Sequence, residues 1–344
     1  MSIELRQVSH RFGATPAVRD LSFDVSRGEL ACLVGPSGCG KTTTLRLIAG
    51  LEPLETGEIR LEGSLVSGGG RFVPPEKRQV GIVFQDYALF PHLTIEDNVR
   101  FGVLKRDADS DERIRWLLRE LEIDDLAARY PHTLSGGEQQ RAALARALAP
   151  GPRIVLLDEP FANLDRKLRL NVRRQVIGLL RQMQATVLMV THDPLEAMRV
   201  SDRVILMQQG RVVQSGTPGQ LAHHPEAPLA IDFFKEMNEL QAVVDVDGTV
   251  GTHWGRFAAD GHAPGDRVTV MIDPGAIRRA GSGPIQALVC EARPVGPVGV
   301  VRLAEGAVHD GHMIMHTSPY GLPGSDETIT LAVDPAGVYI FGEA

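Results

Sequence analysis

A glycine-rich segment near the N-terminus has the residue types that bind phosphate. It reads Gly35-Pro36-Ser37-Gly38-Cys39-Gly40-Lys41-Thr42, is followed by Thr43, and matches the pattern G-x-x-x-x-G-K-[ST] in full. Glycines let backbone N–H groups turn towards phosphate oxygens, and the start of a helix adds positive partial charge. Lys41 would reach the outer phosphates of a nucleotide, and the Thr42 hydroxyl would bind Mg²⁺. The segment therefore predicts a site for a nucleoside triphosphate with its magnesium ion.

A pair of acids, Asp158 and Glu159, directly follows the apolar segment 154–157. At the end of a strand, Asp158 is suited to the coordination shell of Mg²⁺, and Glu159 is suited to polarising a water beside the terminal phosphate. Kinases that act on small molecules do not need this second acid. The pair therefore favours hydrolysis of the nucleotide over transfer of its phosphate to another substrate.

Short apolar segments alternate with helical patterns over the first two-thirds of the chain, which predicts an α/β fold with a largely parallel sheet. Strands are expected at 30–34, 81–84, 153–157, 186–190 and 203–207, and helices at 41–49, 111–121, 137–149 and 166–184. This order puts the glycine segment between a strand and a helix, and the acid pair at the end of another strand. Both are the positions that the proposed chemistry requires.

The sequence changes character after about residue 240, where Gly, Pro and Val become frequent and short alternating runs replace helical patterns. The segment 270–274 (Val-Met-Ile-Asp-Pro) resembles 331–335 (Leu-Ala-Val-Asp-Pro), and each follows a Pro-Gly turn. Two such units predict paired small β-lobes of the OB type, with chance similarity between two hairpins as the alternative. We place the boundary between the two parts near 236–241.

The overall composition excludes several classes of protein. The 344 residues are 43% hydrophobic and carry a net charge of −7, which argues against disorder and against nucleic-acid binding by bulk charge. The three cysteines, Cys32, Cys39 and Cys290, are too few and too scattered for a disulfide framework or a zinc site. No secretory signal and no apolar segment of membrane-spanning length is visible. We therefore expect a cytoplasmic protein whose membrane role, if it has one, depends on partners.

A third motif lies between the two phosphate-related motifs. The segment Leu134-Ser135-Gly136-Gly137-Glu138 resembles the LSGGQ signature of the ABC ATPases, with Glu138 in place of the usual Gln. The other motifs of the family occur along the chain in the expected order. Phe12 matches the aromatic residue that stacks on adenine, and Gln85 matches the glutamine of the Q-loop. Asn163-Leu164-Asp165 matches the D-loop, and His192 matches the switch histidine. The resemblance covers roughly residues 1–235.

This resemblance implies a fold and a set of site residues. The fold would be an α/β P-loop NTPase at 1–236, with a RecA-like core, an antiparallel β subdomain and a helical subdomain at about 87–150. A C-terminal all-β regulatory domain of the TOBE/OB-like kind would follow at 241–344. Mg²⁺ would bind Thr42, Gln85 and Asp158, with Glu159 as the general base and His192 orienting the water and the terminal phosphate. ATP would contact Phe12, Gly35, Pro36, Ser37, Gly38, Cys39, Gly40, Lys41, Thr42, Thr43, Ser135, Gly136, Gly137 and Glu138.

The resemblance also implies partners. In the family, two copies bind head to tail and bury two ATP molecules between them. The nearest subfamilies are ATP-binding subunits of bacterial importers, which work with two transmembrane permease subunits or halves and, indirectly, a periplasmic substrate-binding protein. The chain would then lie at the cytoplasmic face of the inner membrane, without nucleic acid. Tyr87, Leu89 and Phe90 could form a docking surface for the permease, or could pack within the helical subdomain.

The transported substrate is the least determined feature. The segments 73–78 and 90–94 most resemble the ferric-iron importer subfamily, so iron(III) is ranked first, ahead of polyamines or phosphonates and then sugars. A soluble ABC ATPase acting on DNA or ribosomes is the alternative of a different class, but a single ABC unit without coiled coils or zinc motifs disfavours it. In the C-terminal part, His253, His309, His312 and His316 could sense a metal, although solvated loop histidines are the favoured interpretation.

Overall fold

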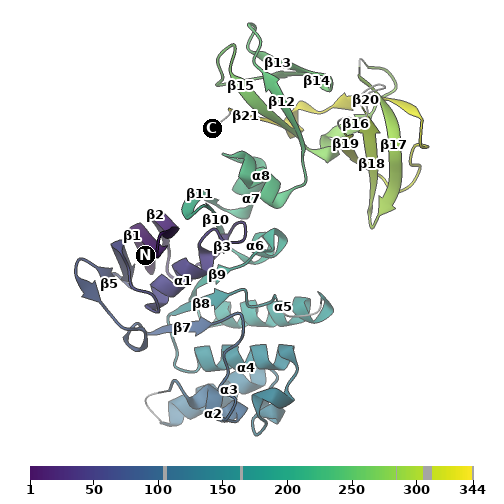
Figure 1. The fold of residues 1–344 in the computed structure, drawn as a ribbon. Helices are drawn as coiled ribbons and strands as arrows, with labels where there is room; N and C mark the ends of the chain where they lie inside the picture. The colour runs from purple at the N-terminus through teal and green to yellow at the C-terminus, as the bar shows by residue number, and fades with distance from the viewer. Residues whose placement is uncertain (104–106, 163–165, 284, 305–311, 343–344) are drawn as a thin grey trace. The chain divides into compact units, whose positions relative to one another are not determined.

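The computed structural model describes residues 1–103, 107–162, 166–283, 285–304 and 312–342. Internal contacts divide the chain into two compact units, Met1–Glu226 and Ala227–Ala344 (Figure 1). The division falls ahead of the boundary expected at 236–241, so that helix α8 (Pro228–Phe234) belongs to the second unit. Each unit has its own hydrophobic core.

A six-stranded sheet forms the centre of the first unit, in the order β11-β10-β3-β9-β8-β7. Five of its strands are parallel, and only β11 runs antiparallel to its neighbour β10. Every residue of β3, β8 and β9 is buried, as expected for parallel strands that are covered on both faces. The strands are β3 (Leu30–Val34), β7 (Val80–Val83), β8 (Ile154–Asp158), β9 (Thr186–Val190), β10 (Arg203–Gln208) and β11 (Arg211–Gly216).

The helices of the core follow individual strands of this sheet. They are α1 (Lys41–Ala49) after β3, α5 (Arg166–Gln182) after β8, α6 (Pro194–Val200) after β9, and α7 (Pro218–His223) after β11. Val190 is in register with both Leu33 and Asp158, so β3, β9 and β8 end side by side. Loops that leave the carboxyl ends of neighbouring parallel strands meet at one edge of the sheet, where α/β proteins bind their ligands.

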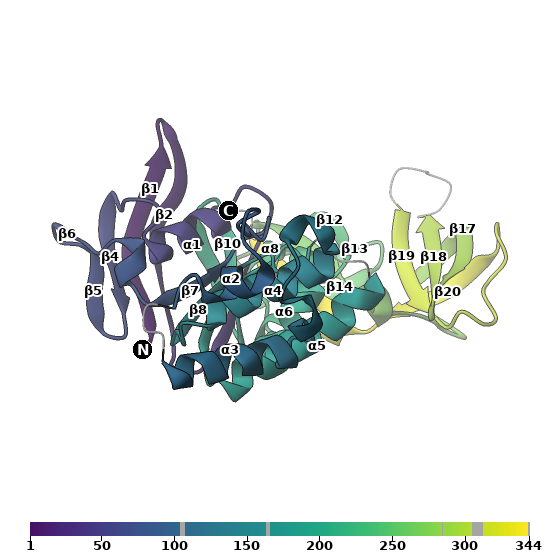
Figure 2. The same ribbon diagram turned by 90° about the horizontal axis from the view of Figure 1, so that it is seen from below.

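A second, antiparallel sheet has the order β2-β1-β4-β5-β6 (Figure 2). Its strands are β1 (Ile3–Phe12), β2 (Thr15–Val25), β4 (Thr56–Leu61), β5 (Ser64–Gly68) and β6 (Arg71–Phe72). Buried side chains such as Ile3 and Ile59 join Leu45 and Ile48 of α1 in one core. The glycine segment and its helix are therefore packed between the two sheets of this unit.

The remaining part of the first unit is helical. It contains α2 (Ile95–Arg100), α3 (Ala108–Glu120) and α4 (Gly136–Leu148), together with the short 3₁₀ turns η2 (Asp124–Leu126) and η3 (Pro131–Thr133). Helices α2 and α3 both pack against α4 (Figure 1). Helix α3 begins earlier than the expected residue 111 because Asp107 caps it, accepting a hydrogen bond from the Ser110 backbone N–H at 3.0 Å.

The buried Arg78 connects helix α1 to the antiparallel sheet. It follows the 3₁₀ turn η1 (Pro75–Lys77) and is 5% exposed. Its guanidinium donates to the carbonyls of Leu47 and Ile48 at 2.9 and 2.8 Å, to the Val73 carbonyl at 2.7 Å and to the Ser67 hydroxyl at 2.7 Å. Burial lowers the pKa of Arg78 to about 10. The arginine thus gives the Ile48 carbonyl a donor at the C-terminus of α1, and it gives a second donor to the Leu47 carbonyl, which already accepts from the Gly50 N–H at 3.2 Å.

We expect Arg78→Ala to lower the free energy of unfolding by about 3 kcal/mol, because it removes the four hydrogen bonds of a buried guanidinium group. Urea unfolding followed by circular dichroism would measure the change. The matched control is Lys77→Ala, an exposed cation of the preceding residue, for which a change below about 0.5 kcal/mol is expected. Equal stability of the two variants would contradict the structural role of Arg78.

Beyond α8, the described residues of the second unit form strands in three sheets, β12-β15-β21, β13-β14 and β16-β20-β17-β18-β19. Its core contains the fully buried Trp254 together with side chains from each of the three sheets. The all-β character expected for this part is confirmed, and its strands fit an OB-like domain. The strands are β12 (Asn238–Val243), β13 (Thr249–Thr252), β14 (Gly255–Ala258), β15 (Arg267–Ile272), β16 (Ile277–Arg279), β17 (Ile285–Val295), β18 (Val298–Ala304), β19 (His312–Thr317), β20 (Thr328–Val333) and β21 (Val338–Gly342).

The two similar Asp-Pro segments take equivalent places in this unit. Strand β15 leads through Asp273 into the 3₁₀ turn η4 (Pro274–Ala276) and β16, and β20 leads through Asp334 into η5 (Pro335–Gly337) and β21. The strands then exchange partners, since β16 pairs with β20 and β21 pairs with β15. Reciprocal backbone bonds of 2.9 Å join the Asp273 N–H to the Gly337 carbonyl and the Asp334 N–H to the Ala276 carbonyl. The sequence similarity therefore marks a structural repeat.

Candidate functional site

The predicted phosphate segment forms a tight loop between β3 and α1. Gly35 and Gly40 have φ angles of 149° and 103°, which favour glycine. A Cβ at Gly35 would lie 2.1 Å from the Met207 carbonyl oxygen, and one at Gly40 would lie 2.2 Å from that of Ala17. The neighbouring backbone thus excludes any side chain at these two positions. The backbone therefore requires glycine at the first and last glycine positions of the predicted phosphate segment.

Lys41 is held over this loop by the loop's own carbonyl groups. Its Nζ donates to the Gly35 oxygen at 2.8 Å and to the Pro36 oxygen at 2.9 Å, and the residue is 7% exposed. An anion bound in the loop would compete with these carbonyls for the ammonium group. Thr42 and Thr43 follow in the first turn of α1.

The three predicted metal ligands line one cavity of about 600 Å³. The Thr42 hydroxyl donates to Asp158 Oδ1 at 3.1 Å, and burial raises the pKa of the Asp158 carboxyl. Hydroxyl, amide and carboxylate oxygens are the donors that Mg²⁺ prefers, so this set fits the ion. Arg46 of α1, which the sequence did not single out, adds a positive charge to the wall. The lining residues are Thr42, Arg46, Phe84, Gln85, Asp86, Ala88 and Asp158.

Glu159 and His192 lie in direct contact at the ends of β8 and β9. Glu159 has a φ angle of 46°, a sparsely populated conformation that costs about 1–3 kcal/mol in a residue with a side chain. Its backbone N–H donates to the Val190 carbonyl at 2.9 Å, which fixes the turn against β9. His192 Nδ1 lies 3.0 Å from Glu159 Oε2, and the His192 side chain is 58% exposed. At this distance the carboxylate and the imidazole can form a hydrogen bond.

The signature residues Ser135, Gly136, Gly137 and Glu138 begin helix α4, and they are not among the residues that line the Thr42–Asp158 cavity. The backbone N–H and the hydroxyl of Ser135 both donate to the Glu138 carboxylate at 2.7 Å. These bonds lower the pKa of Glu138. The substitution of Glu for Gln therefore places a carboxylate on the serine that the resemblance assigns to phosphate. The D-loop residues Asn163, Leu164 and Asp165 lie outside the described residues.

Phe12 lies at the end of β1, in the hairpin that β1 forms with β2. The ring is 49% exposed and packs edge-on against His10, with ring centroids 4.8 Å apart. Strand β2 of the same hairpin brings Ala17 against Gly40 of the phosphate loop. An exposed aromatic ring on a hairpin that contacts the loop is suited to stacking on a base.

Helix α4 makes two connections that sequence reasoning missed. Gln140 donates to the carbonyl of Pro160, the residue after Glu159. Arg146 donates to the carbonyls of Tyr87 and Ala88 at 2.9 and 2.6 Å, where both residues have positive φ. Helix α4 therefore contacts both the segment after Gln85 and the segment after Glu159. No sequence pattern signals these contacts, because they join distant parts of the chain.

The expected permease-docking residues differ in exposure. Tyr87 is 6% exposed and packs inside the unit, which is the alternative interpretation for this residue. Leu89 and Phe90 are half-buried, and the Phe90 ring lies 4.3 Å from that of Phe101. Only Leu89 and Phe90 therefore retain surface that a partner could contact.

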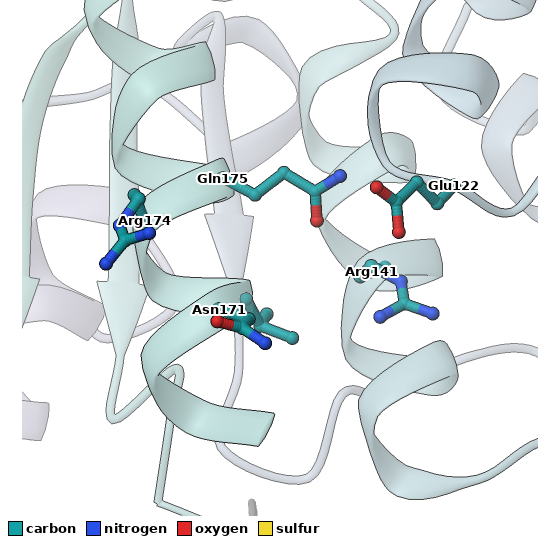
Figure 3. Close-up of a pocket in the computed structure, with 6 residues that line it drawn as sticks. Glu122, Arg141, Asn171, Arg174 and Gln175 are labelled. Atoms are coloured by element: carbon teal, nitrogen blue, oxygen red, sulfur yellow. The ribbon is translucent and has the colours of Figure 1, made fainter. Parts of the chain in front are cut away.

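A separate cavity of about 430 Å³ lies between α5 and α4 (Figure 3). The Gln175 side chain extends from α5 towards Glu122, and Arg141 of α4 lies below them in this view. The cavity contains none of the predicted site residues. It is lined by Glu122, Arg141, Asn171, Val172, Arg174 and Gln175.

Comparison with known proteins identifies the family of this chain. The family model of the ABC transporters matches residues 18–162. The chain is also 41% identical over 330 residues to the sulfate/thiosulfate import ATP-binding protein of Bradyrhizobium diazoefficiens, which covers 93% of both chains. The chain belongs to the ABC transporter ATPases. The family expected from the motifs, and the P-loop fold that goes with it, are confirmed.

Other relatives of this ABC ATPase differ in the substrate they are named for. The Fe(3+) ions import ATP-binding protein of Pseudomonas fluorescens is 45% identical over 245 residues, or 71% of this chain and 69% of that protein. A bacterial ABC transporter cassette solved as a dimer is 30% identical with a TM-score of 0.56, covering 63% of this chain and 98% of that one. The same cassette was solved in a post-hydrolysis state with ADP and Pi. The relatives therefore do not single out the ferric-iron subfamily.

Two further features of the ABC ATPase concern membranes and metals. None of the helices in the described ranges is both long and apolar enough to cross a membrane. In the same ranges, no three His, Cys, Asp or Glu side chains are placed to hold a metal ion. His309 lies outside these ranges, while His253 packs against the buried Trp254, with ring centroids 5.9 Å apart. The described histidines of the second unit thus form no metal cluster.

Proposed function

We propose that this chain is the ATP-hydrolysing subunit of an ABC importer. The observation that carries the proposal is the contact between Glu159 and His192 beside the cavity that Thr42 and Asp158 share. A base, an orienting imidazole and a set of oxygen ligands close to a phosphate loop are the parts that hydrolysis of a nucleoside triphosphate requires.

Each residue has a role in this proposal. The loop N–H groups and Lys41 bind the outer phosphates, and Glu159 accepts a proton from the attacking water at a carboxylate oxygen. His192 holds the terminal phosphate and the water in line. Mg²⁺, held by Thr42, Gln85 and Asp158, would neutralise charge on the phosphate oxygens. Phe12 would stack on the adenine.

We further propose that two copies form the active assembly, with Ser135 to Glu138 of one copy facing the nucleotide of the other. These residues begin a helix, whose N–H groups suit a phosphate, yet they do not line the cavity of their own chain. The related cassette solved as a dimer supports this arrangement. The Ser135 hydroxyl would then exchange the Glu138 carboxylate for a phosphate oxygen.

In the proposed importer, two transmembrane permease subunits or halves bind this dimer at the cytoplasmic face of the bacterial inner membrane. A periplasmic binding protein supplies the substrate, and the C-terminal β-domain (241–344) is regulatory. The half-buried Leu89 and Phe90 are candidate permease contacts. A soluble, non-transport ABC ATPase is less well supported, because the relatives named above are import proteins or a transporter cassette.

For the substrate we propose sulfate or thiosulfate ahead of iron(III). The sulfate/thiosulfate relative aligns over 93% of this chain, whereas the Fe(3+) relative aligns over 71%. The iron expectation from the segments 73–78 and 90–94 thus loses its first rank, and polyamines, phosphonates and sugars have no support from these relatives.

A transport measurement tests both the function and the substrate. Cells that lack this chain are expected to lose uptake of ³⁵S-sulfate, and the wild-type chain should restore it while Glu159→Gln should not. Uptake of ⁵⁵Fe(III) is the parallel measurement in the same cells. Loss of iron uptake with normal sulfate uptake would reverse the ranking, and unchanged uptake of both would contradict an importer of either ion.

A further inference from the structure

The segment that carries His192 is fixed by a closed set of hydrogen bonds. The hydroxyl of Thr191, a 2% exposed residue, donates to Glu196 Oε2 at 2.6 Å and accepts from the Asp193 N–H at 3.1 Å. Asp193 Oδ1 in turn accepts from the Glu196 N–H at 3.1 Å and caps helix α6. His192 lies between these residues and is the one that reaches out to Glu159.

Glu196 is an acidic residue in a buried position. It is 4% exposed, and burial raises the pKa of its carboxyl. Arg173 of α5 forms an ion pair with Glu196 Oε1 at 3.9 Å, and this arginine is itself only 13% exposed. A carboxyl group at such a site costs free energy compared with an apolar side chain, so packing alone does not account for it.

The same carboxyl group lies next to the proposed catalytic pair. Thr191, His192, Glu196 and Glu159 line one small cavity. The Glu159 N–H is bonded to the Val190 carbonyl, directly before Thr191. A change in the backbone at Thr191 would therefore alter the position of His192 relative to Glu159.

We propose that Thr191 and Glu196 are positioning residues, which hold His192 against Glu159, and that Arg173 connects this arrangement to helix α5. The inference rests on the proposed role of His192 in hydrolysis. Thr191 supplies the hydroxyl that joins the two sides of the turn, and Glu196 fixes the orientation of that hydroxyl. Helix α5 follows strand β8 and the Glu159 turn, so the Arg173–Glu196 ion pair joins the segment after β8 to the segment after β9.

A double-mutant cycle tests the inference in the full-length chain. Thr191→Val keeps the shape of the side chain but removes the hydroxyl, and we expect kcat to fall about 10-fold with an unchanged Kd for ATP. Thr191→Ser keeps the hydroxyl and should stay within about twofold of the wild type. In a His192→Ala background, Thr191→Val should cause no further loss, because the threonine acts through the histidine.

A matched control separates positioning from stability. Thr186 is also buried (1% exposed) and lies at the other end of β9, where its hydroxyl accepts from the Gly28 N–H at 3.0 Å. Thr186→Val should lower the unfolding temperature about as much as Thr191→Val, with kcat unchanged. Equal losses of kcat for Thr186→Val and Thr191→Val would overturn the inference.

Two outcomes of the cycle distinguish this inference from the proposed function. The same fold-loss for Thr191→Val in the wild-type and His192→Ala backgrounds would overturn the positioning role and leave the role of His192 intact. An unchanged kcat in His192→Ala itself would overturn the role of His192 in hydrolysis, and the positioning role with it.

Discussion

Glu159→Gln is expected to bind ATP with wild-type affinity but to hydrolyse it at least about 100-fold more slowly, the effect of removing a positioned base. The substitution keeps the size of the side chain and its contact with His192, which is 3.0 Å away in the native protein. It replaces the carboxylate by a neutral amide, which is too weakly basic to accept a proton from water. Binding should survive because Lys41 and the phosphate loop remain in place.

Phosphate release and equilibrium binding of ATP would be measured on the same preparation. Glu112→Gln, at an exposed position of α3, is the matched control and should hydrolyse ATP at the wild-type rate. Near-normal hydrolysis by Glu159→Gln would show that the base is another group. The strained φ angle of Glu159 would then lack a catalytic explanation.

Lys41→Ala should weaken ATP binding about 100-fold or more, since it removes a charge-assisted contact to the outer phosphates. In the native protein the ammonium group already lies over the loop, bonded to the Gly35 and Pro36 carbonyls. Little reorganisation is therefore needed for Lys41 to meet a phosphate. The alanine variant leaves the loop glycines and Thr42 unchanged, so the loss should measure the contribution of this cation.

Isothermal titration calorimetry with ATP would give the affinity, and circular dichroism would verify that the variant is folded. Lys77→Ala, an exposed position on η1, serves as the control for the loss of one positive charge and should bind ATP normally. A folded Lys41→Ala variant with unchanged affinity would argue against the glycine segment as the phosphate site.

Local sequence patterns were sufficient to predict the helices and strands around the phosphate loop. Helix α1 and strands β3 and β9 have the bounds expected from the sequence, because glycines and apolar runs define them without help from the rest of the chain. The strands β7 and β8 are shifted by one residue, and α3 begins at a cap that periodicity alone did not reveal. Boundaries depend on single hydrogen bonds, whereas the existence of an element depends on many residues.

The sequence by itself determined which residues of this protein have the chemistry for nucleotide hydrolysis, because glycine spacing, a lysine and strand-end acids are local properties. Only the tertiary structure decided which of them meet. The parallel pairing of β8 and β9 brings Glu159 to His192, and the fold brings Gln140 and Arg146 of α4 to distant loops. In the second unit, the pairing of β15 with β21 and of β16 with β20 is likewise decided by the tertiary structure. Such contacts join residues far apart in the chain, so they follow from how the elements pack and not from the local pattern.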